Sequence, residues 1–355
     1  MSGDINNSTA VRSSNNFDML RLVMALSVFF VHSFDLSGSE GLKFLTSIFS
    51  STVAVNSFFI ISGFLIFMSY DRSSSLRSYM EKRVRRIAPA YIAVVTICAF
   101  AGLLVSSYGF SGYFTLDWLK YYGANILTLN FLEPALPGVF MENKYNAVNG
   151  ALWTIKIEVM FYVSVPIVAY FLSRYNKALV CIVIYVLSVV YFLYFTSLYD
   201  HTGQKIYWQL SLLLPGSMSF FISGALLYYY QDSFSEKKYY MLAAGVAGYL
   251  IYKYSGYSAV FYPIMPISLA LIIIYFATAF YYVGNWARYG DLSYGVYIWH
   301  FPVVQLLIYK GYFQMPVVGL VMSFVIVFLC AFLSWHIIEK RALMSSSHYI
   351  KASSR

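Results

Sequence analysis

The sequence predicts an all-α fold, a polytopic transmembrane helical bundle of about ten spans with both termini cytoplasmic. The chain is 60% hydrophobic and only 11% charged, whereas about a quarter of the residues of a soluble domain are charged. Its apolar residues gather in long runs, and a run of about 20 residues can cross a bilayer as a helix. The basic residues fall mainly in alternate loops, as they do in membrane proteins.

The apolar runs predict where the spans lie. They cover residues 17–36, 45–70, 87–107, 150–172, 178–196, 208–230, 239–253, 259–283, 293–310 and 316–337. The longest stretch between runs is 108–149, which would face outside. Its part 116–131 is apolar enough to form an extra re-entrant or interfacial helix. The remainder is divided by glycine and proline turns.

The distribution of basic residues sets the orientation. With the N-terminus inside, 17 of the 24 lysines and arginines face the cytoplasm, six face outside, and Lys156 lies in a span. This asymmetry places both termini in the cytoplasm. The net charge of +9 therefore reflects topology and membrane lipid contact, and we expect no nucleic-acid partner.

The domain organisation follows from the same pattern. Residues 1–16 are polar and without a short apolar core, which predicts a disordered cytoplasmic tail with no cleavable signal peptide. Residues 17–340 form one membrane domain, and residues 341–355 form a second cytoplasmic tail. The three cysteines lie in apolar runs without metal-ligand spacing, so we expect buried thiols and no metal.

The first span, FDMLRLVMALSVFFVHSF, carries an arginine and a histidine. Arg21 and His32 are eleven residues apart, about three helical turns, so they share a face roughly 16 Å apart along the axis. Ionisable side chains inside a span usually serve function. His32 could accept a proton from a hydroxyl as a general base, with Asp35 orienting its ring, or it could only bond a neighbouring helix.

A basic segment lies between the second and third spans, on the cytoplasmic side. Arg83 and Arg86 are one turn apart and precede Pro89. Their guanidinium groups could bind the phosphates of a nucleotide-based acyl donor. Alternatively, the segment serves only topology and lipid headgroup contact.

The fourth and ninth predicted spans also contain polar residues. Glu158 lies within a span, and Lys156 is on a different helix face, so we expect Glu158 to meet His32 or Arg21 from another helix. His300 precedes Pro302, so it could bind substrate or bond carbonyl groups freed by the proline.

Two further pairs have packing alternatives. Ser62 and Gly63 form a small-residue face that suits close helix packing or passage of a substrate chain along the backbone. His336 and Glu339 are one turn apart near the end of the last span, where we expect a helix-end pair.

These residues occur in an order that resembles the acyltransferase type 3 family of membrane proteins. The resemblance rests on Arg-x10-His in the first span, FFxxSGFLI in the second, a cytoplasmic RxxR before a proline, LWTIKIEVMFY, and LSYGVYIWHFPV near the end. It covers about residues 17–340. Members have about ten transmembrane helices and move acyl groups, usually acetyl from cytoplasmic acetyl-CoA, onto hydroxyls of cell-surface glycans.

The resemblance implies roles for Arg21, His32, Arg83, Arg86 and Glu158. We expect a catalytic group comprising His32, Glu158 and Arg21, donor binding by Arg83, Arg86, Ser62 and Gly63, and substrate contacts from His300 and Trp153. The expected partners are acyl-CoA and a surface polysaccharide or lipid-linked oligosaccharide, and the expected location is the bacterial inner membrane. The alternative is a proton-coupled transporter or flippase, for which no paired broken helices are found in corresponding halves.

Overall fold

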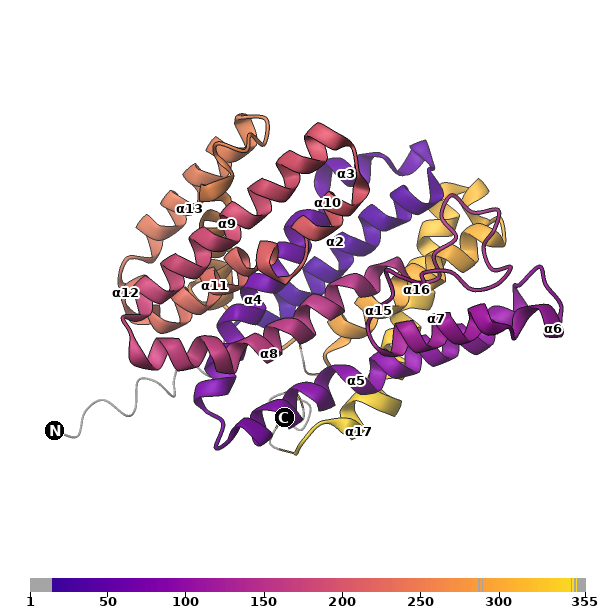
Figure 1. Ribbon diagram of the computed structural model, residues 1–355, viewed down its shortest axis with the longest axis horizontal. Helices are drawn as coiled ribbons and strands as arrows, with labels where there is room; N and C mark the ends of the chain where they lie inside the picture. Colours follow the sequence, from indigo (N-terminus) through magenta and orange to yellow (C-terminus); the bar gives the residue numbers. More distant parts are fainter. Residues whose placement is uncertain (1–14, 287, 289, 346, 348, 350–355) are drawn as a thin grey trace. The chain divides into compact units, whose positions relative to one another are not determined.

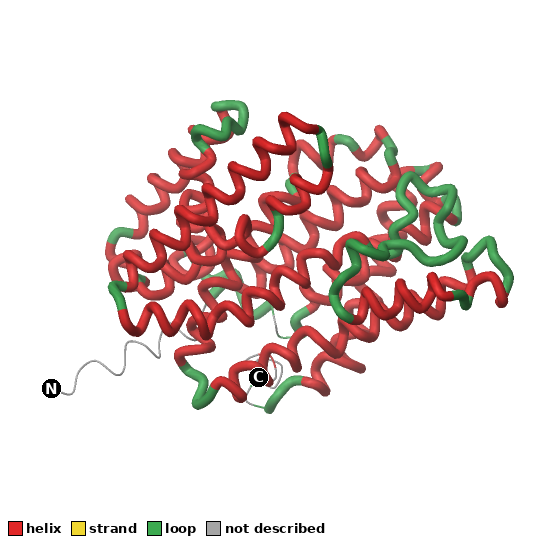
Figure 2. The backbone as a smooth tube through the Cα atoms, in the orientation of Figure 1, coloured by secondary structure: helices red, strands yellow, loops and turns green. Residues whose placement is uncertain are grey.

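The regular structure of this chain is helical, as the sequence predicts. The structure is a computed structural model, and it describes residues 15–286, 288, 290–345, 347 and 349. No β-strand occurs within these ranges, and Figure 2 shows helices joined by loops. Most of the expected N-terminal tail, residues 1–14, and most positions after 345 lie outside the described residues.

Sixteen α-helices are described, several of them short. They are α2 (Phe17–Ser37), α3 (Phe44–Ile48), α4 (Ser51–Asp71), α5 (Leu76–Ala101), α6 (Phe110–Tyr113), α7 (Leu116–Ile126), α8 (Trp153–Arg174), α9 (Lys177–Thr202), α10 (Lys205–Ser211), α11 (Leu214–Tyr229), α12 (Gln231–Glu236), α13 (Lys238–Tyr254), α14 (Met265–Ile274), α15 (Leu292–Tyr309), α16 (Pro316–Ser334) and α17 (Lys340–Ala342). The short 3-10 helix η3 (Gly150–Leu152) precedes α8, and the π-helices η5 (Tyr275–Ala279) and η7 (Trp335–Glu339) continue α14 and α16.

Each of the ten predicted spans falls on helix. Eight helical segments in the described chain are long and apolar enough to cross a membrane: Phe17–Ser37, Glu40–Asp71, Leu76–Leu104, Gly150–Arg174, Lys177–Thr202, Lys205–Tyr229, Tyr262–Ala279 and Pro316–Ala342. The other two predicted spans are α13, which is short at 17 residues, and α15, which carries His300 and Gln305 among its apolar residues. The protein is therefore a multi-pass membrane protein, and ten spans remains a prediction.

The chain forms two compact units. Unit 1 comprises Met1–Leu20, Val55–Met80 and Ile157–Gly284, and unit 2 comprises Arg21–Ala54, Glu81–Lys156 and Asn285–Arg355. In unit 1, α11 packs against α9 (Figure 1). The helix α14 packs against both α11 and α13. The Phe161 and Phe221 rings stack there with centroids 4.1 Å apart, so aromatic side chains fill this interior.

Unit 2 is organised around α15, which packs against α16 and η3. Gly295 allows the close approach, because a Cβ atom at this position would lie 2.7 Å from the Cα of Ala331 in α16. Most of α15 is buried. A helix that is enclosed by protein can carry polar side chains at membrane depth, so α15 is suited to hold a site.

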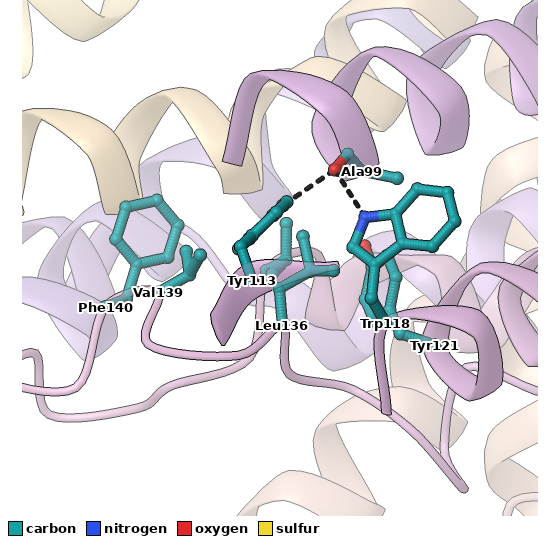
Figure 3. Packing of buried hydrophobic residues seen from close by; sticks show 8 residues of the cluster. Ala99, Tyr113, Trp118, Tyr121, Leu136, Val139 and Phe140 are labelled. Atoms are coloured by element: carbon teal, nitrogen blue, oxygen red, sulfur yellow. Dashed lines mark hydrogen bonds between the residues drawn. The ribbon is translucent and has the colours of Figure 1, made fainter. Parts of the chain in front are cut away.

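The predicted helix within 116–131 is present in a shorter form. It is α7, which has 11 residues and ends where Thr128 adopts a positive φ of 61°. Tyr113 and Trp118 both donate hydrogen bonds to the carbonyl of Ala99, at 2.7 and 2.9 Å (Figure 3). Ala99 lies in the last turn of α5, whose carbonyls lack partners within the helix. The two aromatic donors therefore cap α5 and hold α7 against it.

Candidate functional site

The first helix carries the arginine and the histidine that the sequence singled out. α2 is one helix of 21 residues, so Arg21 and His32 share a face, as predicted. Each pairs with a residue of α15 or of its N-cap. Arg21 lies 3.7 Å from Asp291, the N-cap of α15, and His32 contacts His300 in the same helix. The two pairs define two levels of one site.

The histidine level is a direct pair of imidazoles. His32 Nδ1 and His300 Nε2 are 2.9 Å apart, and the rings stack at 29° with centroids 5.1 Å apart. His300 is completely buried, and His32 is half-buried. Phe301 meets the His32 ring edge-on, with centroids 5.8 Å apart. The pair is therefore enclosed on the side of α15, while part of His32 stays accessible.

The hydrogen bonds assign the proton positions of both rings. His300 Nδ1 lies 2.6 Å from the carbonyl oxygen of Tyr297, which can only accept, so Nδ1 carries the proton. A neutral His300 then has its lone pair on Nε2 and accepts from His32 Nδ1. His32 therefore keeps a lone pair on Nε2, the atom that a general base or a nucleophile uses.

Pro302 explains why α15 offers these carbonyl groups. Proline has no N–H, so the carbonyl of Ile298, four residues earlier, loses its helical partner. Asn149 Nδ2 donates to that oxygen at 2.9 Å. The sequence left open that His300 bonds a carbonyl group freed by Pro302. In the structure Asn149 bonds that carbonyl, and His300 bonds the carbonyl of Tyr297 instead. Pro302 therefore changes the hydrogen bonding of α15 next to the His32–His300 pair and is not itself a member of the pair.

The start of α8 supports the same region of α15. Thr154 Oγ1 is 2.6 Å from the hydroxyl of Tyr297, which also donates to the carbonyl of Ala151 at 3.2 Å. Trp153, expected to contact substrate, is the first residue of α8 and is half-buried beside Thr154. These bonds attach the segment before α8 to the turn of α15 that bears His300.

The second level is a buried cluster of charges. Arg86 Nη2 pairs with the Asp291 carboxylate, and Arg86 Nη1 lies 3.4 Å from Glu339 Oε2. The side chains of both acids are only 2% exposed, and that of Arg86 is 15% exposed. Glu339 also accepts from the hydroxyl of Ser334 at 2.9 Å. With Arg21, the cluster contains two cationic and two acidic side chains, which suits a buried site because unpaired charges there are costly.

Asp291 is the centre of this cluster. Burial raises the pKa of its carboxyl, but Arg86, Arg21 and the hydrogen bonds from Ser293 outweigh burial and hold the pKa below its usual value. Asp291 is therefore ionised at neutral pH and is the observed ionic partner of Arg21. As an N-cap, it also accepts from the backbone N–H of Ser293 at 3.1 Å, so the cluster is fastened to the start of α15.

The structure gives the two arginines of the cytoplasmic motif different surroundings. The Arg86 guanidinium is held by Asp291 and Glu339 and lies 5.5 Å from the Tyr294 ring and 4.8 Å from the Tyr349 ring. Arg83 lies one turn earlier in α5 and is half-buried. The Arg86 guanidinium is therefore held by internal acids.

Glu158 and the small-residue pair both belong to unit 1. Glu158 accepts a hydrogen bond from the hydroxyl of Tyr162, one turn later in α8, at 2.5 Å. A Cβ atom on Gly63 would lie 1.8 Å from the carbonyl oxygen of Phe221, so Gly63 serves close contact between α4 and α11. Ser62 is beside it and half-buried. Of the two alternatives for Gly63, the structure therefore shows close helix packing.

Two expected contacts are replaced by others. Glu339 pairs with Arg86, while His336 Nδ1 bonds the carbonyl of Phe332 at 2.9 Å. The expected pair fails because the π-helix η7 changes the residue spacing of this turn. The His32 ring is oriented by His300, and the backbone carbonyl of Asp35 accepts from Lys144 at 2.9 Å.

Sequence reasoning overlooked Asp291 and Asn149, and it assigned Glu339 to a pair with His336 rather than to Arg86. One signal was available for Asp291, because an aspartate directly before an apolar helix is a typical N-cap. A second was available for Asn149, since Pro302 leaves a carbonyl that some donor must satisfy. No group of three or more metal-ligating side chains that could hold a metal ion occurs in the described part of the chain.

Comparison with known proteins agrees with the motif order. Residues 14–336 match the model of the acyltransferase 3 family, described as an acyltransferase domain. The chain is 27% identical to an O-acetyl transferase of Shigella phage Sf6, over 95% of this chain and 98% of that protein. It is 30% identical to Nodulation protein 10 of Rhizobium leguminosarum bv. viciae, over 93% of each.

No solved structure matches this chain. The family match covers the histidine pair and all of the charge cluster except Glu339, and it favours acyl transfer over the transporter alternative. The chain therefore belongs to the acyltransferase 3 family and is a multi-pass membrane acyltransferase.

Proposed function

We propose that this protein is an O-acetyltransferase of the bacterial inner membrane, which moves acetyl from cytoplasmic acetyl-CoA to a hydroxyl of a surface polysaccharide or lipid-linked glycan. The observation that carries the proposal is the contact of His32 Nδ1 with His300, whose own bond to the Tyr297 carbonyl implies a lone pair on His32 Nε2. The phage relative, named an O-acetyl transferase, supports acetyl as the transferred group.

The reaction needs a base that acts on an alcohol. His32 Nε2 takes the proton of the acceptor hydroxyl as its oxygen attacks the thioester carbonyl. A C–O bond forms, the C–S bond breaks, and the proton returns from His32 to the departing thiolate. During this step His32 becomes an imidazolium, whose Nδ1–H donates to His300 Nε2. A hydrogen bond from a charged donor is stronger than one from a neutral donor, so His300 stabilises the charged state.

A second route starts from the same lone pair. His32 Nε2 could attack the thioester first, and the acyl-histidine could then pass its acyl group to the hydroxyl. Mass spectrometry of protein mixed with acetyl-CoA and quenched within milliseconds separates the two routes. An acetyl group on the peptide containing His32 supports the covalent route, and its absence supports the general base.

The basic segment supports a cytoplasmic donor. Coenzyme A carries phosphates at one end and the thioester at the other, so cationic groups and the reactive histidine must lie at different depths. Arg21 and His32 are about 16 Å apart along α2. We assign phosphate contact chiefly to Arg83, and we assign Arg86 and Arg21 to the ion cluster that orients the start of α15.

The test uses cells of the source organism that lack this gene. The gene is restored as wild type, H32A or H201A, and the extracted surface polysaccharide is analysed by mass spectrometry for acetyl groups. His201 is a matched control because it is exposed at the end of α9. We expect acetylation with wild type and H201A and loss with H32A at equal membrane abundance. Acetylated polysaccharide from H32A cells would refute the proposal.

A further inference from the structure

The strongest unexplained feature near the histidine pair is a buried oxygen. Asn149 is 5% exposed, and its Oδ1 atom has no hydrogen-bond partner among the described residues. The same is true of the indole N–H of Trp299, the residue next to His300. Buried polar groups are almost always bonded, so each of these two atoms needs an explanation.

The orientation of the Asn149 amide is determined by its other contact. Its Nδ2 faces the carbonyl oxygen of Ile298, which can only accept, so a flipped amide would bring two acceptors together. Oδ1 must therefore point away from that carbonyl.

The segment that carries Asn149 is firmly attached to α15. Gln305 donates to the carbonyls of Tyr145 and Ala147 at 2.6 and 2.8 Å, and Asn143 donates to the carbonyl and the side-chain oxygen of Gln305 at 3.0 Å. Gln305 is completely buried. The open oxygen is thus not the result of a loose loop, since the chain just before it is bonded in place.

Contacts connect Asn149 with the reacting histidine. Gly150 follows it and lies against the Phe301 ring, where a Cβ atom would be 2.8 Å away. That ring in turn meets His32 edge-on. Residues 108–149 are expected to face outside, so an acceptor that approaches His32 from outside would pass this segment.

We propose that Asn149 positions the acceptor glycan by accepting a hydrogen bond on Oδ1 from a hydroxyl neighbouring the one that is acylated. The inference rests on the proposed function and adds a residue for the acceptor. A sugar suits the site, because a hydroxyl next to the one that is acylated can supply the donor that Asn149 Oδ1 lacks. Asn149 thus has two functions, with Nδ2 supporting the proline turn and Oδ1 receiving the substrate.

The experiment compares N149L with N149D. Both variants lose the donor to the Ile298 carbonyl, but only aspartate keeps an accepting oxygen. Purified full-length protein receives acetyl-CoA and increasing amounts of polysaccharide extracted from the gene-deleted strain. We expect N149L to raise the half-saturating polysaccharide concentration roughly five- to tenfold, the effect of one lost neutral hydrogen bond. N149D should stay closer to wild type in this value.

A purely structural role gives the opposite order. Aspartate would place an acid against the Ile298 carbonyl, so N149D would then be as impaired as N149L or more so. That order, or an unchanged half-saturating concentration in N149L, would overturn the proposal. N130L is the matched control, because Asn130 is also a buried asparagine with an unpartnered Oδ1, and we expect no change in half-saturation.

Two further arms complete the test. If either variant fails to fold, both are made in a P302A background, where the substituted alanine supplies an N–H to the Ile298 carbonyl and relieves the structural need for Asn149. The same rank order is expected there. If neither wild type nor H32A transfers acetyl to the polysaccharide, the proposed function fails and this inference fails with it. If transfer depends on His32 but not on Asn149, only the inference fails.

Discussion

Replacing His300 tests the reasoning about the histidine pair most directly. H300L removes both ring nitrogens, so nothing accepts from His32 Nδ1 and the imidazolium formed during transfer loses its partner. Hydrogen bonds to charged groups contribute about 1.5–3 kcal/mol. Because about 1.4 kcal/mol corresponds to tenfold in rate, H300L should lower kcat by roughly ten- to a hundredfold. H32A should cost more, about 10²–10⁴-fold, because it removes the base itself.

H300Q provides a conservative control. The glutamine side-chain oxygen can accept from His32 Nδ1 much as His300 Nε2 does, so we expect H300Q to retain more activity than H300L. The assay is acetyl transfer from labelled acetyl-CoA to extracted polysaccharide, expressed per molecule of folded protein. A structural role for His300 instead predicts that H300Q and H300L lose folded protein and activity in parallel.

The double variant H32A/H300L gives the decisive result. If His300 acts through His32, removing both should cost about as much as removing His32 alone, since groups that act as a unit are strongly non-additive. If the losses of activity in the two single variants instead multiply in the double variant, His300 does not act through His32.

The surroundings of the charged residues give four more predictions. Arg83→Lys should weaken binding of acetyl-CoA to the purified protein, because lysine cannot form a bidentate phosphate contact; equal affinity would leave topology as the sole role of Arg83. Arg86→Lys should lower folded protein in the membrane, because it weakens the ion pairs to buried acids; normal abundance with lost donor binding would contradict this. Asp291→Asn should destabilise by about 3–5 kcal/mol, the effect of breaking a buried pair. Because the pKa of Asp291 is lower in the folded state, its contribution to the free energy of unfolding is present above about pH 4 and is lost as the pH falls through the folded-state pKa. The melting temperature of D291N should therefore fall less steeply than that of wild type as the pH is lowered. Glu158→Gln should reduce activity more than abundance if Glu158 serves catalysis; parallel losses of both, matched by Tyr162→Phe, would assign the pair to stability.

The sequence by itself determined the all-helical membrane class and the positions of the main helices. Hydropathy and helical period are local properties, and the bilayer requires long apolar helices, so the ten predicted segments all fall on helix. The shared face of Arg21 and His32 also follows from one helix alone. The order of the short motifs was sufficient to indicate the acyltransferase family.

Only the tertiary structure decided which residues meet. His32 and His300 are 268 positions apart, and no local pattern states that one orients the other. Six basic residues crowd the segment of Arg86 and suggest a phosphate ligand, but no local pattern indicates that Arg86 pairs with Asp291 and Glu339. The physical reason is the same in each case. A buried polar group must find a partner, and that partner is set by helix packing across the bundle rather than by neighbours along the chain.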